Sequence, residues 1–178
     1  MTAYANETPA AITRVPVRRL TAEAFGPYGD VIDASGNPSY LANGGTAQVH
    51  RDIAAVDLAA DGGRVCVSVV RTAPTALPLR ITVMERHPLG SQAFVPLDGA
   101  ECLVVVAPAG DLNASAIVAF QCSPSQGVNY RRGTWHHPLI ALHGASDFVV
   151  IDRQGEGENL ELVAITEPLV IDTLLSPV

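Results

Sequence analysis

The chain has 178 residues, of which 48% are hydrophobic and only 16% are charged, and its formal net charge is −7. That length suits one domain with a sizeable buried core, and such a composition excludes extensive disorder. The acidic balance also excludes a general nucleic-acid binder, because phosphate contacts require clustered basic side chains.

The first third of the chain predicts a short helix followed by a loop. In LTAEAFGPYGDVID, Thr21 can cap a helix, Glu23 suits its first turn, and Gly26-Pro27 ends it. The stretch DASGNPSYLANGG has the composition of a loop. We see no signal-peptide pattern and no run of about 18 apolar residues, so we expect a cytoplasmic protein.

From Arg64 onward the sequence becomes a series of short β-type runs separated by turn residues. No segment between them is long enough for a crossover helix, which excludes a parallel βαβ sheet. The spacing predicts an all-β sandwich or barrel. The runs are 64–72, 79–87, 92–97, 101–109, 116–122, 128–132, 134–142, 147–153 and 158–166.

Familiar catalytic signatures are absent, and what remains is histidine and arginine at strand positions. We find no GxGxxG after a strand, no P-loop, no GxSxG and no HExxH. The three cysteines form no CxxC pair, so we expect buried free thiols. Nucleotide, serine-hydrolase and zinc-protease chemistries therefore lose their main support.

The first polar cluster is MERHPLGSQAF, residues 84–94. Arg86 and His87 end a strand, a Pro-Leu-Gly turn follows, and Gln92 begins the next strand. A strand end beside a tight turn is where a scaffold presents reactive side chains. The alternative is a surface ion pair between Glu85 and Arg86, with His87 only capping the turn.

The second cluster is GVNYRRGTWHHPL, residues 127–139, which holds two of the five histidines and the only tryptophan. In an extended segment successive side chains point to opposite faces, so only one of His136 and His137 can line an interior. Both faces are too mixed for periodicity to decide which one. A structural role for either histidine is an equal alternative.

Together, ERHPLGSQAFVPL, QGVNYRRGTWHHPL and DFVVIDR resemble the ureidoglycolate lyase family, and LTAEAFGPYGDVID, the ANGG loop and His50 resemble its opening. The likeness covers most of residues 15–165. It implies a cupin-type β-barrel, that is, a double-stranded β-helix or jelly roll, with a short N-terminal helix. We expect one cupin-like domain over residues 1–178, with 1–14 and 167–178 as terminal extensions, and a homodimer.

The resemblance also implies a carbon–nitrogen lyase of the amidine-lyase class, which splits ureidoglycolate into glyoxylate and urea during allantoin and purine breakdown. The expected partner is this small anionic substrate, with no nucleic acid or membrane. Asp152 matches the family pattern as well. The expected catalytic residues are His87, His136 and His137, and the expected substrate-binding residues are Arg86, Gln92, Asn129, Tyr130, Arg132 and Trp135.

Metal-binding cupins, by comparison, have an HxH pair with a following Glu in a first motif and another His in a second. Here His87 lacks an HxH partner, and His136 stands near the second-motif position. Two nitrogens with Gln92 or Glu101 would make a weak site. We expect no cofactor and no metal ligands, although a divalent metal is left open.

Two other functions are alternatives to the lyase. One is a non-catalytic cupin that binds a small carboxylate as a sensor or accessory protein. The other is a metal-dependent cupin oxygenase or isomerase, which predicts stoichiometric metal after purification.

Overall fold

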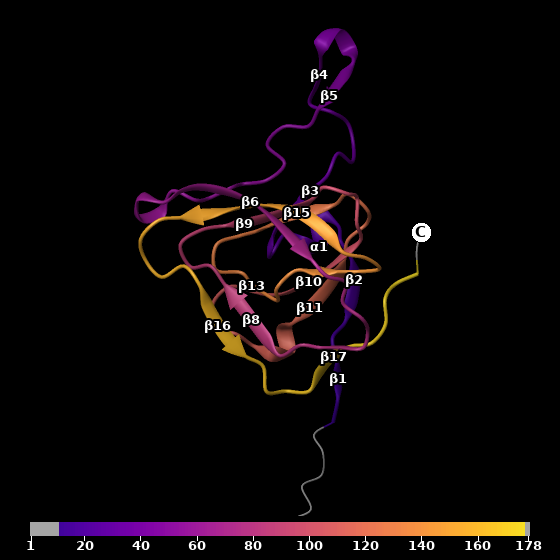
Figure 1. Cartoon of the computed structure of the whole chain (residues 1–178), viewed down its shortest axis with the longest axis vertical. Coiled ribbons are helices and arrows are strands. Elements are labelled where there is room, and N and C mark those ends of the chain that lie inside the picture. The colour runs from indigo at the N-terminus through magenta and orange to yellow at the C-terminus, as the bar shows by residue number, and fades with distance from the viewer. Residues whose placement is uncertain (1–10, 177–178) are drawn as a thin grey trace, which may run out of the picture.

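The computed structural model describes residues 11–176 and confirms the predicted all-β, cupin-like class (Figure 1). The one α-helix in this range, α1 (Ala22–Phe25), is capped as the sequence predicted, because the Thr21 hydroxyl accepts a hydrogen bond from the Ala24 N–H at 3.2 Å. None of the helices described is long and apolar enough to cross a membrane.

The strands form two large sheets, one small sheet and a hairpin. The five-stranded sheet has the order β3 (Gly29–Ile32), β12 (Gly127–Tyr130), β9 (Gln92–Pro96), β15 (Ser146–Gln154) and β6 (Arg64–Thr72). The seven-stranded sheet has the order β16 (Glu161–Ala164), β8 (Val83–Arg86), β13 (Trp135–His136), β10 (Cys102–Ala107), β11 (Val118–Gln121) and β2 (Val17–Arg19), and β14 (Ile140–Ala141) pairs with β10.

Strand β10 lies at the centre of the molecule, so both of its faces are buried. This explains its uninterrupted apolar sequence. One face packs toward the five-stranded sheet in a core that includes Val104, Phe120 and Phe148. The other face packs toward the small sheet in a core that includes Val105 and Leu169. The small sheet consists of β1 (Thr13–Arg14), β17 (Leu169–Ile171) and β7 (Leu79–Arg80).

Two of the predicted runs are divided in the structure. Run 79–87 gives β7 to the small sheet and β8 to the seven-stranded sheet. Run 134–142 gives β13 and β14, which both pair with β10 and are separated around Pro138. Proline has no N–H to donate to a ladder, so a break there is expected.

Strands β1 and β17 lie within the expected terminal extensions. Thr13–Arg14 pairs in parallel with Leu169–Val170, and this pairing ties the two ends together over one core. The expected extensions also include residues 1–10 and 177–178, which lie outside the described residues.

The stretch DASGNPSYLANGG, predicted to be a loop, contains the first strand and the turn of a hairpin. Strands β4 (Tyr40–Ala42) and β5 (Ala47–Val49) are joined by a 3-10 turn at Asn43–Gly45, and the hairpin projects from the body at the top of Figure 1. Two further 3-10 turns lie at Ala60–Gly62 and Ala114–Ala116.

Candidate functional site

The pairing of β8 with β13 brings the two sequence clusters together. His136 lies opposite Glu85 in this antiparallel pair, and His87 follows directly after β8. The His87 and His136 rings are 5.2 Å apart between centroids. Glu85, His87 and His136 each present a possible ligand atom, and these atoms all lie within 4.8 Å of one another. We call this group the histidine–glutamate cluster.

Alternation along the strands decides which side chains join the cluster. On β8, Met84 packs into the core under the small sheet, so Glu85 and His87 point to the opposite side. On β13, Trp135 belongs to that same core, whereas His136 faces the space between the two large sheets, where it contacts Tyr130.

The structure brings His136 into the cluster but not His137. His136 is buried, with 1% of its surface exposed. His137 is half-buried, and its Nδ1 lies 2.7 Å from the carbonyl oxygen of Pro138. Burial lowers the pKa of both histidines. Only His136 therefore combines a neutral, enclosed imidazole with a second histidine nearby.

Tyr130 and Gln92 hold the His136 ring from two sides. The Tyr130 ring stacks on it, with centroids 4.2 Å apart and an interplanar angle of 14°. Gln92 Oε1 lies 3.2 Å and Glu85 Oε1 lies 3.5 Å from His136 Nε2. The hydrogen bond with His136 lowers the pKa of Glu85, although burial opposes this, so the carboxylate is ionised beside the imidazole. The His136 ring is thus held in one orientation by Tyr130, Gln92 and Glu85.

A backbone carbonyl group selects the tautomer of His87, whereas His136 has acceptor oxygens beside both of its ring nitrogens. His136 Nδ1 lies 3.0 Å from the Thr134 oxygen, and His87 Nδ1 lies 2.7 Å from the Asn159 oxygen. A carbonyl only accepts hydrogen bonds, so the neutral His87 ring carries its proton on Nδ1 and its lone pair on Nε2. The neutral His136 ring has a single N–H, which can donate either to the Thr134 oxygen or to the Gln92 and Glu85 oxygens near Nε2. His87 Nε2 is buried and has no hydrogen-bond partner.

With the His136 proton on Nδ1, lone pairs converge from two imidazoles, the Glu85 carboxylate and Gln92 Oε1. An arrangement of acceptors without a donor fits either a proton in transit or a bound cation. Histidines that ligate metals commonly donate their other ring N–H to a carbonyl, and a carbonyl oxygen lies beside Nδ1 of both rings here. Imidazole and carboxylate ligands together suit divalent transition metals such as Zn²⁺ or Ni²⁺.

A pocket of about 350 Å³ lies beside the cluster, between the inner faces of the two large sheets. Two carboxylates, from Glu85 and Asp152, line it, and none of its lining residues is a lysine or an arginine. The lining residues are Ser68, Val70, Thr72, Glu85, Gln92, Phe94, Pro138, Leu139, Val150 and Asp152.

Arg86 and Trp135, both expected to bind substrate, lie together on the opposite side of the seven-stranded sheet. The Arg86 guanidinium stacks over the Trp135 ring at 4.5 Å and pairs with Glu161 at 2.6 Å. Both side chains also donate hydrogen bonds to the Gly110 carbonyl. The ion pair between Arg86 and Glu85, the alternative reading, is not formed, because neighbouring residues on a strand face opposite ways.

Replacing Arg86 with alanine is expected to leave the KM for substrate within about twofold of wild type, because the side chain does not face the pocket. Loss of the stacked and paired guanidinium should lower the free energy of unfolding by about 1 kcal/mol. Steady-state kinetics and denaturant unfolding measure the two effects. Arg14→Ala, which removes a more exposed pair with Asp172, is the control. A tenfold rise in KM would contradict this placement.

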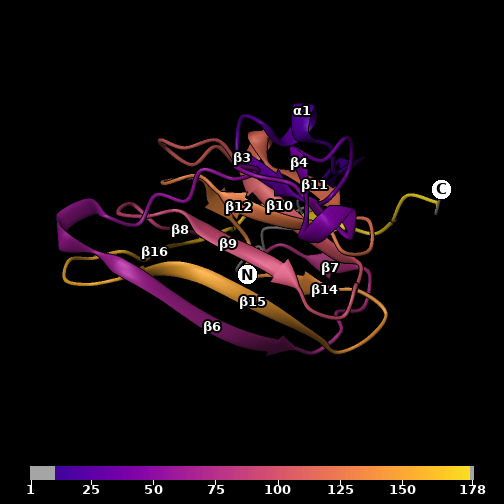
Figure 2. The same cartoon turned by 90° about the horizontal axis from the view of Figure 1, so that it is seen from above.

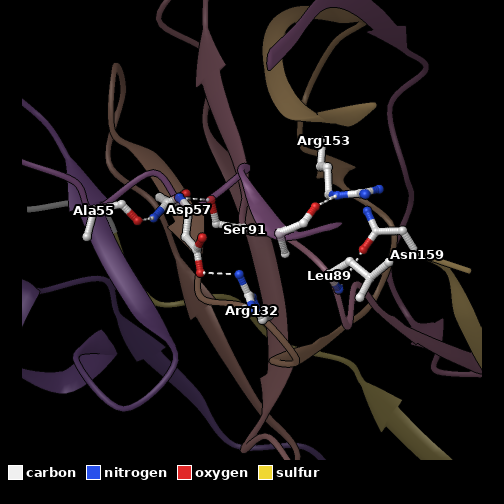
Figure 3. A network of polar contacts seen from close by, with 9 residues as sticks. Ala55, Asp57, Leu89, Ser91, Arg132, Arg153 and Asn159 are labelled. Carbon is white, nitrogen blue, oxygen red and sulfur yellow. Dashed lines mark hydrogen bonds and ion pairs between the residues drawn. The ribbon is translucent and has the colours of Figure 1, made fainter. Parts of the chain in front are cut away.

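Asn129 and Arg132 also lie outside the cluster, where they hold a loop against the five-stranded sheet; Figure 3 shows Arg132. The Asn129 amide donates to Asp30 and to the Ala55 carbonyl. Arg132 pairs with Asp57 at 2.7 Å, and the Asp57 N–H donates to the Ser91 hydroxyl at 2.9 Å. These contacts fix the loop before β6 close to the start of β9.

Two side chains that the sequence analysis did not single out, the buried Arg153 and the half-buried Asn159, support the same region. Arg153 donates hydrogen bonds to the carbonyl groups of Ala60, Asp61 and Glu156. Asn159 Oδ1 accepts a hydrogen bond from the Leu89 N–H at 2.8 Å (Figure 3). Because the Asn159 carbonyl also contacts His87, this residue positions both the turn and the ring.

Glu85 is the member of the cluster that sequence reasoning missed, since it was considered only as a partner of Arg86. The signal was available in part, because residues 85 and 87 of one extended run share a face. What the run does not contain is His136, whose approach turns this face into a three-ligand cluster.

Residues 12–172 match the family described as ureidoglycolate lyase. A protein named ureidoglycolate lyase from Burkholderia mallei (strain NCTC 10229) is 51% identical over 162 residues, which cover 90% of this chain and 95% of that protein. Proteins of the same name from Burkholderia cepacia and Mesorhizobium japonicum are 51% and 46% identical, over 84% of this chain and 85% and 92% of their own lengths.

Proposed function

Because the chain belongs to the ureidoglycolate lyase family, we propose that the histidine–glutamate cluster cleaves ureidoglycolate into glyoxylate and urea. The enzyme is thus a carbon–nitrogen lyase. The observation that carries the assignment to this cluster is the unpartnered, buried Nε2 of His87, which lies close to His136 and to Glu85, a carboxylate that lines the neighbouring pocket.

The reaction needs one proton to move between two places on the substrate. Ureidoglycolate carries a hydroxyl group and a ureido nitrogen on the same carbon, next to a carboxylate. Removal of the hydroxyl proton lets the oxygen form the carbonyl group of glyoxylate while the carbon–nitrogen bond breaks. The electron pair of that bond leaves with the urea nitrogen, which then takes a proton. No oxidant or water is consumed.

We assign the proton transfers to His87 and His136. His87 Nε2 has no hydrogen-bond partner, so it is free to accept the hydroxyl proton. His136 is close enough in the cluster to stabilise or relay this proton toward the departing nitrogen. Gln92 lines the pocket and has the donor and acceptor groups that suit a ureido group. Tyr130 acts by holding the His136 ring.

The same residues fit a divalent cation, with His87, His136 and Glu85 as the ligands. A cation bound there would occupy the Nε2 lone pairs of both histidines, so it would replace their proton transfers and would instead polarise an oxygen of the substrate, which makes the hydroxyl group more acidic. The sequence analysis expected no metal on the basis of two histidines; Glu85 raises the number of candidate ligands to three.

Chelator-treated protein is expected to bind about one equivalent of Zn²⁺ or Ni²⁺ and to gain activity when the ion is returned. Isothermal titration with each metal alone measures binding independently of turnover. His87→Ala and Glu85→Gln should bind the ion at least about tenfold more weakly, since each loses one ligand. Unchanged activity after chelation, with no measurable binding of either ion, would contradict a metal role and leave the histidines as acid and base alone.

The test of the lyase itself is the release of products from ureidoglycolate by the wild-type protein. Urea and glyoxylate should appear in equal amounts and in parallel, with and without added divalent metal. Binding of ureidoglycolate with no release of urea under either condition would favour the sensor or accessory protein instead.

We further propose that the protein acts in the cytoplasm, in allantoin and purine breakdown, as a homodimer. The family assignment supports the pathway, since ureidoglycolate is the substrate in the family name. An exposed apolar strand at the edge of the five-stranded sheet supports association of two chains. Sedimentation of the purified chain tests the last point.

A further inference from the structure

The pocket beside the cluster has the wrong charge for the proposed substrate. Its lining residues include two carboxylates, Glu85 and Asp152, and no lysine or arginine. Ureidoglycolate carries a carboxylate of its own, and enzymes usually hold such a group with an arginine. Within the described residues, Arg86, Arg132 and Arg153 are all engaged elsewhere. A cationic side chain is therefore missing from this pocket in the single chain.

The same pocket borders an unpaired strand. β6 pairs along its whole length with β15, but it ends the five-stranded sheet, and none of the strands in residues 11–176 pairs with its other edge (Figure 2). The strand is nine residues long, has no proline or lysine, and exposes Val65, Val67 and Val69 by 57%, 65% and 62%. A long, apolar, unprotected edge strand is a template for pairing with another chain.

We propose that β6 pairs in an antiparallel manner with β6 of a second copy about a two-fold axis, and that Arg64 of the partner subunit completes the pocket. This inference rests on the proposed function, because it assigns the substrate carboxylate to that arginine. The strand that pairs with this free edge is therefore β6 of an identical chain.

The register of the sheet shows which face Arg64 shares. Ser68, Val70 and Thr72 line the pocket, and the register from Arg64 to Thr72 against β15 is continuous. Side chains alternate along a strand, so Arg64 is on the pocket face of β6, as are all its even-numbered neighbours. Arg64 itself is exposed and forms none of the ion pairs found within residues 11–176.

Two-fold pairing moves this arginine to the other chain's pocket. In an antiparallel pair, opposed residues point to the same face. With Ser68 at the axis, Arg64 of the partner subunit lies opposite Thr72; with Val67 at the axis, it lies opposite Val70. Both are pocket-lining positions, so the conclusion does not depend on one exact register.

The strand is also self-complementary in these registers. With Ser68 at the axis, Val67 meets Val69 and Cys66 meets Val70, while Arg71 meets Val65, so no two arginines oppose each other. The positive Arg64 approaches a pocket with two carboxylates, which favours its placement before substrate arrives. Arg71 faces the other side of the sheet and pairs there with Asp147 of its own chain.

Mixed dimers test the proposal directly. Two differently tagged chains, one with His136→Ala and one with Arg64→Ala, are co-expressed and purified through both tags. Each homodimer should be impaired, and Arg64→Ala should raise the KM for ureidoglycolate by about 10- to 100-fold. The mixed dimer contains one site with both groups intact, so it should recover about half of the wild-type activity. Arg71→Ala, on the same strand but the opposite face, is the matched control and should keep the wild-type KM.

The remaining outcomes are decisive as well. A monomeric wild-type chain in sedimentation, a wild-type KM in Arg64→Ala, or no recovery in the mixed dimer would each overturn the proposal. If wild-type protein releases no urea, the proposed function fails, but the pairing of the two β6 strands can still be tested by a measurement that does not need catalytic activity. In a Cys66→Ser background, Ser68→Cys chains should then be joined by a short bis-maleimide cross-linker into covalent dimers, and their absence would overturn the pairing.

Discussion

Replacing His136 with alanine is expected to lower kcat by about 10²- to 10⁴-fold, the range typical of a lost acid or base. The side chain is buried, stacks on Tyr130 and places Nε2 next to Glu85 and Gln92. No other described side chain is in position to replace His136 Nε2 in proton transfer, since His137 lies outside the cluster. Initial rates of urea release measure the loss.

Because His136 is part of a packed core, a second variant keeps this prediction interpretable. His136→Gln keeps a polar side chain of similar reach, and it should remain folded yet still lose most of kcat. His143→Asn is the matched control, because His143 is exposed, lies beside Glu101 and adopts a positive φ that asparagine tolerates. An active, folded His136→Gln enzyme with near-wild-type kcat would remove His136 from the mechanism.

Replacing Gly29 with alanine is expected to destabilise the fold by about 3 kcal/mol or more, which corresponds to a fall in Tm of roughly 6–12 °C for a chain of this size. Gly29 pairs with Tyr130 at the edge of the five-stranded sheet. A Cβ atom at this position would overlap the backbone carbonyl oxygen of Asn129, and backbone cannot yield as a flexible side chain does. Thermal unfolding followed by circular dichroism measures the change.

The effect of Gly29→Ala should extend to the site, since shifting β3 from β12 disturbs Tyr130 and hence the His136 ring. Gly144→Ala is the control, because a Cβ there meets nothing within 4 Å and its φ is not positive. That variant should stay within about 0.5 kcal/mol of wild type. Equal stability of the two variants would show that the β3–β12 contact can relax.

The local parts of the fold could be read from the sequence. The cap at Thr21 and the extended run 64–72 appear as predicted, because capping and alternation depend on residues only a few positions apart. The run 134–142 could not be read in the same way. Thr134, Trp135 and His136 are all buried, so both faces of this short segment are covered and its polarity does not reveal which face meets which sheet.

By itself, then, the sequence determined the all-β class, the family resemblance and the presence of two polar clusters. Only the tertiary structure decided that His136 rather than His137 meets His87, that Glu85 joins them, and that Arg86 and Trp135 face the other way. The physical reason is that alternation along a strand fixes which side chains share a face, whereas the pairing of β8 with the distant β13 fixes which faces meet.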